Sequence, residues 1–254
     1  MAVKDMLKHF DDSDRIFAAH IMDLCDQVEQ GRGKRCTSFC DIHQSSLVRQ
    51  IGQAYDLCIK PDGGYADAER VLFLIAQTQW ELPDSPVVPI LLQTYAPVTH
   101  RDVLGSALGL GIKREAIGDI VKTKDGQVMF VKPPADRLIL DELKRIGREA
   151  VRCTVLDRRD VPEPIRDYRE IKGTVKSLRL DSVVSLCAGC SREKGKQLVE
   201  KELVTVDAVM RSDPAFSLPS SAILSIRGFG KFRVCCDGGV TAKGRYFITV
   251  NKYI

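Results

Sequence analysis

Hydrophobic positions in the first third of the chain follow a helical period and then form one short apolar run. Residues 4–30 place apolar side chains close to helical spacing. Asp41 stands where it can cap a second helix that reaches about Tyr55. The run "VLFLIA" (71–76) has the length of a buried strand. These elements predict a small α/β unit over residues 1–85.

The middle third alternates between strand and helix patterns. The expected strands are "VVPILLQTYA" (87–96), "AIGDIVK" (116–122), "GQVMFVK" (126–132) and "EAVRCTVL" (149–156), and the expected helices are "HRDVLGSALGLG" (100–111) and "ADRLILDELKRIG" (135–147). The order β-α-β-β-α-β is that of a ferredoxin-like, or RRM-like, split βαβ unit. We therefore expect a ferredoxin-like central domain over residues 86–157.

The last third begins after a charged segment that contains two prolines, residues 158–173, which predicts a linker. Two short helices follow in "LRLDSVVSLC" and "SREKGKQLVEKE", with Ser191 placed to cap the second. Four strand patterns then fill the rest of the chain. The fold class is α+β, with a third domain over residues 174–254.

Composition narrows the class of protein. With 254 residues, 44% hydrophobic and 28% charged, the chain should fold rather than stay disordered. The N-terminus is charged and has no apolar core of a signal peptide, and no apolar run reaches about 18 residues, so no membrane segment is expected. Nine cysteines, an odd number, favour reduced thiols in the cytoplasm over a disulfide framework.

Charge is unevenly distributed. Residues 174–254 hold 13 Lys and Arg against 7 Asp and Glu, whereas residues 1–173 hold 25 against 27. A basic third on a near-neutral body is typical of a region that binds a polyanion. A solvated basic face without a partner fits the same numbers.

The cysteine pair Cys187 and Cys190 raises the question of a metal or redox site. A zinc site needs four ligands, but the four histidines all precede residue 101, and the adjacent Cys235 and Cys236 make a poor second pair. A redox pair would follow a strand, and this pair stands between two helices. We therefore expect packing cysteines, no metal and no cofactor. "HRDVLG" (100–105) lacks the rest of a kinase motif.

The basic side chains around the two short helices predict RNA binding. Apolar residues of the helices can face each other, which leaves Arg179, Arg192, Lys194 and Lys196 on an outer face. Cations one turn apart suit the phosphates of an A-form groove. "RGFGKFRV" (227–234) matches only the first half of an RNA-recognition octapeptide, so Arg227, Lys231 and Arg233 are expected to contact phosphates.

Longer stretches carry a family resemblance. "SLRLDSVVSLCAGCSREKGKQLVEKELVTV" resembles the S4-type αL RNA-binding domain, which is named after small-subunit ribosomal protein four. The whole chain resembles the bacterial YlmH family, through "TSFCDIHQ" (37–44), "DGGYADAER" (62–70), "THRDVLGSALGLGIKREAIGDIV" (99–121) and "SIRGFGKFRV" (225–234).

The resemblance implies a non-enzymatic cytoplasmic protein that binds ribosomal RNA of the large subunit and tRNA as peptidyl-tRNA. It implies a role in ribosome-associated quality control of stalled nascent chains. The RNA-binding residues it carries over are Arg179, Ser191, Arg192 and Lys194, with Arg227, Lys231 and Arg233 added. The turn before the strand at "LVTV" departs from the αL pattern because it lacks the usual glycine.

Two other classes of function stay open. An RNA-modifying enzyme, such as a pseudouridine synthase or methyltransferase, often carries an S4-type domain, although no glycine-rich cofactor loop is present here. A protein-interaction adaptor would instead use the central ferredoxin-like sheet.

Overall fold

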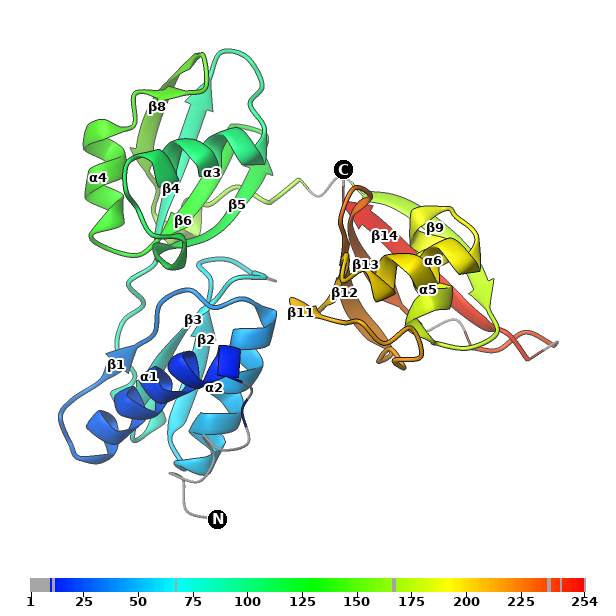
Figure 1. The fold of residues 1–254 in the computed structure, drawn as a ribbon. Coiled ribbons are helices and arrows are strands. Elements are labelled where there is room, and N and C mark those ends of the chain that lie inside the picture. Colours follow the sequence, from blue (N-terminus) through cyan, green and yellow to red (C-terminus); the bar gives the residue numbers. More distant parts are fainter. Residues whose placement is uncertain are drawn as a thin grey trace. The chain divides into compact units, whose positions relative to one another are not determined.

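The computed structural model describes residue 10 and residues 12–66, 68–165, 168–236, 239–242 and 244–253. The chain divides into two compact units, Met1–Ile165 and Arg166–Ile254. Figure 1 shows the ribbon of each unit. In the described part of the chain, no helix is both long and apolar enough to cross a bilayer.

The N-terminal part of the first unit places two helices against a three-stranded sheet. The helices are α1 (Asp12–Glu29) and α2 (Ile42–Ala54), and the sheet has the order β1-β3-β2, with β1 (Arg35–Cys36), β2 (Cys58–Asp62) and β3 (Leu72–Ala76). Asp41 caps α2 as expected, accepting a hydrogen bond of 2.8 Å from the Gln44 backbone N–H. Residues 4–9 and 11 of the expected first helix lie outside the described residues.

The central part contains a five-stranded antiparallel sheet with two helices. Its strands are β4 (Val88–Thr94), β5 (Ile117–Thr123), β6 (Gly126–Val131), β7 (Arg145–Ile146) and β8 (Glu149–Val155), in the order β5-β6-β4-β8-β7, and its helices are α3 (His100–Gly109) and α4 (Ala135–Glu142). Short 3-10 helices in the described part of the chain are η2 (Gln79–Glu81), η3 (Arg114–Ala116) and η4 (Arg158–Asp160).

The helix expected over residues 135–147 ends early, so the extent of that prediction was wrong. The chain leaves α4 after Glu142, and Arg145 and Ile146 pair with Ala150 and Glu149 as the hairpin β7-β8. Gly147 forms the turn with a φ of 59°, in the left-handed region that favours glycine. A local hairpin therefore replaces the last helical turn.

Both faces of the central sheet are covered. Alternate side chains of its strands, such as Ile90 and Met129, join a core with α3 and α4. The intervening side chains, such as Leu91, Val128 and Phe130, join a second core with Phe39, Leu72 and Leu74 of the N-terminal part. The two sheets of the first unit therefore share one buried core.

The second unit is a six-stranded antiparallel sheet that carries two helices on one face. Its strands are β9 (Tyr168–Val175), β10 (Val204–Val206), β11 (Val209–Met210), β12 (Ser221–Ile226), β13 (Gly230–Cys235) and β14 (Tyr246–Tyr253), in the order β11-β10-β12-β13-β14-β9. The helices α5 (Leu180–Ala188) and α6 (Arg192–Glu200) pack on it through a core that includes Val184, Val199, Phe232 and Val250 (Figure 1).

The last six residues of the segment expected to be a linker, 168–173, belong to this sheet. Residues 168–173 form most of β9, which pairs along its whole length with β14. Charged residues alternate there with Ile171 and Gly173, as an edge strand with one buried face requires. A connecting segment between the units therefore ends before Tyr168.

Candidate nucleic-acid interface

The turn between α5 and α6 explains the cysteine pair. Gly189 ends α5 in the left-handed conformation, with a φ of 62°, and the Ser191 hydroxyl accepts a hydrogen bond of 3.2 Å from the Lys194 backbone N–H. Cys187 is buried in the core, and burial raises the pKa of its thiol to about 12. The described residues contain no group of three or more side chains able to hold a metal ion.

The two helices approach each other closely because residue 195 is glycine. A Cβ atom added to Gly195 would lie 2.6 Å from the Asp181 carbonyl oxygen and 3.0 Å from the Ser185 nitrogen. Both of these atoms are backbone, so they cannot move aside cheaply. Gly195 therefore fixes the distance between the helices, and with it the spacing of the basic side chains on them.

Two arginines from different elements share one buried carboxylate. The Asp181 carboxylate accepts from Arg192 at 3.0 Å and from Arg179 at 3.3 Å. The Asp181 side chain is only 4% exposed, whereas Arg179 and Arg192 are 40% and 56% exposed. Asp181 thus holds both guanidinium groups in place and leaves part of each open to solvent. We call these three residues the arginine fork.

The arginine fork also sets the ionisation of Asp181. Burial by itself would raise the pKa of this carboxyl group, but hydrogen bonds and charges from Arg179 and Arg192 outweigh burial and lower it. Asp181 is therefore ionised at neutral pH. The two cations remain in net excess over the carboxylate.

A hollow lies beside the arginine fork, between α5 and the end of β9. Its volume is about 490 Å³, and its polar lining includes Lys176, Ser182, Ser185, Arg192 and Arg245. The Arg245 guanidinium donates to the Thr174 hydroxyl at 2.9 Å and to the Thr174 carbonyl at 2.6 Å. Hydroxyls and cations that converge on one hollow suit a phosphate backbone.

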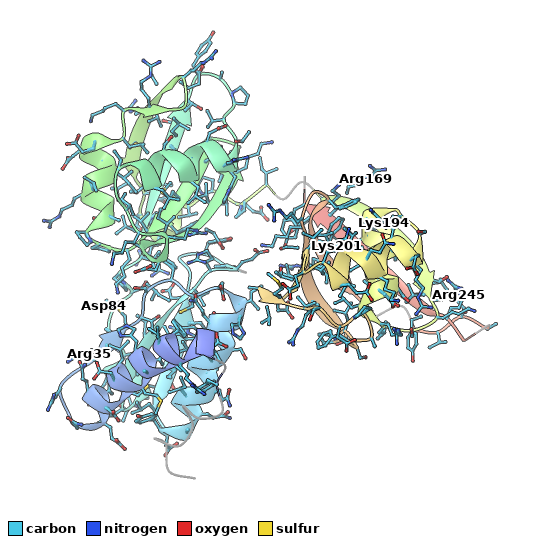
Figure 2. The ribbon with its side chains drawn as sticks, in the orientation of Figure 1. Arg35, Asp84, Arg169, Lys194, Lys201 and Arg245 are labelled. Atoms are coloured by element: carbon cyan, nitrogen blue, oxygen red, sulfur yellow. The ribbon has the colours of Figure 1, made fainter. Side chains whose placement is uncertain are left out.

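The sequence did not identify Lys176, Asp181 or Arg245 as part of this site. Lys176 precedes the predicted helices, and Asp181 carries a negative charge, like the phosphates of the expected ligand. Arg245 lies more than 50 residues from Arg192, and only the pairing of β14 with β9 brings it close. Figure 2 labels Arg245, together with Lys194 and Lys201 on the helix side.

The other predicted residues of the helices lie on α6. Lys194 is exposed in the first turn, and Lys196 forms an ion pair of 3.6 Å with Glu200. Surface pairs of this type contribute little to stability, so Lys196 can exchange its partner at low cost. The Ser191 hydroxyl is occupied by its capping hydrogen bond.

The remaining three predicted residues do not join this group. Arg227 lies in the turn between β12 and β13, where its N–H donates to the Leu203 carbonyl at 2.9 Å. Lys231 and Arg233 alternate in β13 with Phe232, which is buried against the helices, and therefore point to the opposite face of the sheet. The predicted site is thus divided between two faces.

Two of the sequence blocks of the first unit, "DGGYADAER" and "HRDVLG", make contacts that stabilise the fold. Asp119 accepts from the Tyr65 hydroxyl at 2.8 Å and from the Glu69 N–H at 2.7 Å, which ties "DGGYADAER" to the central sheet. In "HRDVLG", Asp102 forms a capping box with Thr99 at the start of α3. Arg114 lies further along the block of residues 99–121 that begins with Thr99. Burial, and then the charge of Arg70, lower the pKa of its guanidinium group to about 10.

Comparison with known proteins gives matches over most of the chain. Residues 13–80 match the family model described as "YlmH, N-terminal", and residues 91–160 match the one described as "Putative RNA-binding domain in YlmH". The "Ribosome-associated protein quality control protein P2" of Bacillus subtilis is 27% identical over 257 residues, which covers 98% of this chain and 99% of that protein.

A solved structure is similar to part of the chain. The "Cell division protein ylmH from Streptococcus pneumoniae" is 24% identical, with a TM-score of 0.55, and the match covers 61% of this chain and 98% of that chain. At this identity the match supports a shared fold.

Proposed function

This chain belongs to the YlmH family, and from that premise we propose that it is an RNA-binding protein without catalytic activity, associated with the ribosome. The name of the Bacillus subtilis relative points to ribosome-associated quality control. We propose the same role here, with large-subunit ribosomal RNA and the tRNA of a stalled peptidyl-tRNA as partners in the cytoplasm.

The single observation that carries the proposal is the arginine fork with the hollow beside it. Arg179 and Arg192 are oriented by a buried carboxylate before any ligand arrives, so little side-chain entropy is lost on binding. Lys176, Lys194 and Arg245 extend the positive charge around them. We call these five basic residues the helix face, and propose that it follows the phosphates of structured RNA.

We also propose assignments for the domains. The two helices and the sheet of residues 174–254 would be an S4-type αL domain, with β9 added to its edge. The strand order of the central part would make residues 86–157 a ferredoxin-like, RRM-like domain, next to a small α/β domain over residues 1–85. The family model at residues 91–160 adds this central domain as a second candidate for RNA contact.

The helix face can be tested by removing two of its charges. We expect the double variant Arg192→Ala, Lys194→Ala to bind a ribosomal stem-loop more weakly and to reduce the salt dependence by about one to two charges. The measurement is a filter-binding titration over a series of salt concentrations. The matched control is Lys34→Ala, Lys60→Ala, which removes two exposed lysines of the first unit.

Sedimentation would extend this test to the ribosome. The wild-type chain should co-sediment with large subunits, with peptidyl-tRNA enriched in that fraction, and the helix-face variant should stay at the top of the gradient. Equal salt slopes for the variant and the wild type would rule out the helix face as the RNA contact.

A further inference from the structure

The sheet of the second unit has a second face on which no helix of the described part of that unit packs. Phe232, Val234, Ile248 and Val250 point toward α5 and α6 and are buried. The side chains that alternate with them belong to the opposite face. On β13, β14 and β9 these are Lys231, Arg233, Cys235, Phe247, Thr249, Asn251, Tyr253, Tyr168, Glu170, Lys172 and Thr174. We call this set the open face.

Strand pairing arranges the open face in rows. Arg233 pairs with Asn251, which pairs with Glu170, and in the next row Cys235 pairs with Thr249, which pairs with Lys172. Lys231 and Arg233 of β13 and Lys172 of β9 therefore lie on opposite sides of β14, and the acidic residue among them, Glu170, pairs with Lys172 at 3.0 Å. Among the described residues of these rows, positive charge is in excess.

Aromatic rings stand near both ends of the strand β14, in the outermost rows. At one end the rings of Tyr168 and Tyr253 meet edge to face, 5.0 Å apart, and the Lys231 ammonium lies 5.1 Å from the centre of the Tyr253 ring. At the other end Phe247 is 45% exposed. Since the two ends lie six residues apart on β14, about 20 Å separates them. Tyr168 and Tyr253 are partly buried, whereas Phe247 is exposed. Accessible rings that flank cations suit a single-stranded nucleic acid, which needs stacking and charge neutralisation.

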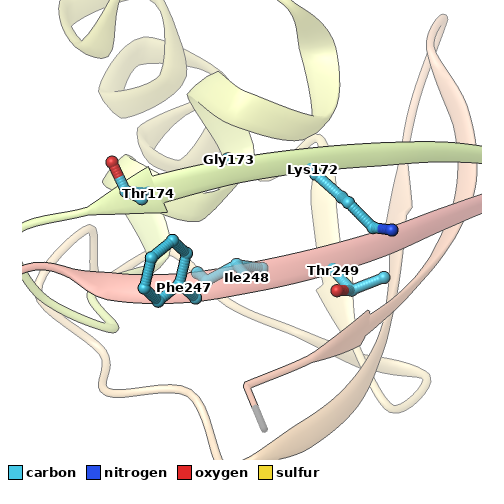
Figure 3. Close-up of a pocket in the computed structure, with 6 residues that line it drawn as sticks. All are labelled: Lys172, Gly173, Thr174, Phe247, Ile248 and Thr249. Atoms are coloured by element: carbon cyan, nitrogen blue, oxygen red, sulfur yellow. The ribbon is translucent and has the colours of Figure 1, made fainter. Parts of the chain in front are cut away.

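The Phe247 ring lies in a hollow of the open face. The hollow measures about 520 Å³ and is lined by Lys172, Thr249 and Phe247, whose side chains appear along the two paired strands in Figure 3. Its lining also includes Thr174, which lines the hollow beside the arginine fork as well. The two hollows therefore adjoin at the edge strand β9, where Arg245 holds Thr174.

We propose that the open face binds a single-stranded RNA segment that continues, around the edge at Thr174, from the structured RNA held by the helix face. One base would stack on Phe247 and another on the Tyr168–Tyr253 pair, with phosphates near Lys172, Lys231 and Arg233. The part of this inference that joins the single strand to structured RNA on the helix face rests on the proposed function. The part that stacks bases on the open face does not.

The test uses the full chain and two RNAs, a blunt stem-loop and the same stem-loop with an eight-nucleotide single-stranded tail. For the wild type, the tail should tighten binding by at least about 5- to 100-fold, the range expected from stacking of one base. Phe247→Leu keeps apolar bulk in the strand but loses the ring, so the tail should lose the share of its effect that stacking on Phe247 supplies, a factor of about 5 or more. Affinity for the blunt stem-loop should stay unchanged, which also shows that the variant is folded.

Two further variants separate this inference from the proposed function. Phe247→Tyr should restore the effect of the tail, because it restores a ring. Arg192→Ala, Lys194→Ala should weaken binding of both RNAs and keep their ratio. If the wild type binds both RNAs equally, or if Phe247→Leu keeps the ratio, the open face is not an RNA contact. A different result is that the Phe247 variants behave as expected while Arg192→Ala, Lys194→Ala binds both RNAs as tightly as the wild type. In that case the proposed function fails, and the open face stands as an RNA contact.

Discussion

The two large sheets of this protein differ in what covers them. The central sheet of the first unit is buried on one face by α3 and α4 and on the other by the strands and loop of the N-terminal part, through Phe39, Leu72 and Leu74. The sheet of the second unit is buried on one face by α5 and α6, and its other face carries polar, basic and aromatic side chains.

This difference shows that strand order alone does not locate a binding surface. An RNA-recognition sheet stacks bases on an exposed face. In the central sheet, the positions on the side away from the helices are filled by Leu91, Val128 and Phe130, which are 9%, 0% and 0% exposed. Those residues are used for packing, so any RNA contact of the central part must use its loops and edges.

The largest effect should come from emptying the shared core. Phe130 is fully buried and stacks on Tyr65, with ring centres 4.7 Å apart. We expect Phe130→Ala to lower the free energy of unfolding of the first unit by about 3–5 kcal/mol. Hydrogen exchange read by mass spectrometry should show faster exchange in residues 12–165 and no change in residues 168–253. A loss under about 1 kcal/mol would mean that this face of the sheet is not buried.

An intermediate effect should come from the arginine fork. Asp181→Asn keeps the shape of the side chain but removes the charge that Arg179 and Arg192 share. Because both arginines are about half exposed, solvent screens part of this interaction, and we expect a loss of about 1–2 kcal/mol in the free energy of unfolding.

The contribution of Asp181 to the free energy of unfolding should depend on pH. The pKa of Asp181 is lower in the folded chain than its ordinary value of about 3.9, so the unfolded state binds more protons in that range. The stabilisation is therefore complete above about pH 4–5 and is lost as the pH falls through the folded pKa. Thermal unfolding from pH 3 to 7 should show a flatter curve for Asp181→Asn, and parallel curves would contradict the fork.

The smallest effect should come from the open face. Thr249 points away from the helices, whereas its neighbour Ile248 is 2% exposed and belongs to the core. Thr249→Val keeps a β-branched side chain, so the free energy of unfolding should change by no more than about 0.5 kcal/mol. Ile248→Ala, as the control in urea unfolding, should cost about 2–5 kcal/mol. A large cost at Thr249 would show that something covers this face.

Much of the fold follows from local patterns in the sequence. The cap at Asp41, the apolar run at β3 and the strands β5 and β6 were all predicted within a few residues, because each depends on neighbours in the chain. The strand β9 was missed because charged residues and prolines around it suggest a linker, and only its pairing with β14 makes it a strand.

The candidate site was predicted in part. Arg179, Arg192 and Lys194 lie on the short helices, where sequence spacing fixes their positions. Arg245 joins the site because the register of β14 on β9 places it there, and Asp181 joins it as a buried partner of the two arginines. Neither the register nor the burial can be read directly from a sequence. Lys231 and Arg233 were grouped with the helix residues because their charge is visible in the sequence, whereas the direction in which they point depends on the sheet.

The core that joins β3 to the central sheet has a consequence for how this protein can be divided and recombined. A fragment of residues 91–160 alone would keep Leu91, Val128 and Phe130 but lose Phe39, Leu72 and Leu74, so its apolar side would self-associate. A chimera between relatives that exchanges the chain near residue 85 would cut through this core, whereas one joined after Ile165 would leave it whole. Recombination between relatives should therefore preserve the fold when it exchanges the first 165 residues as a whole.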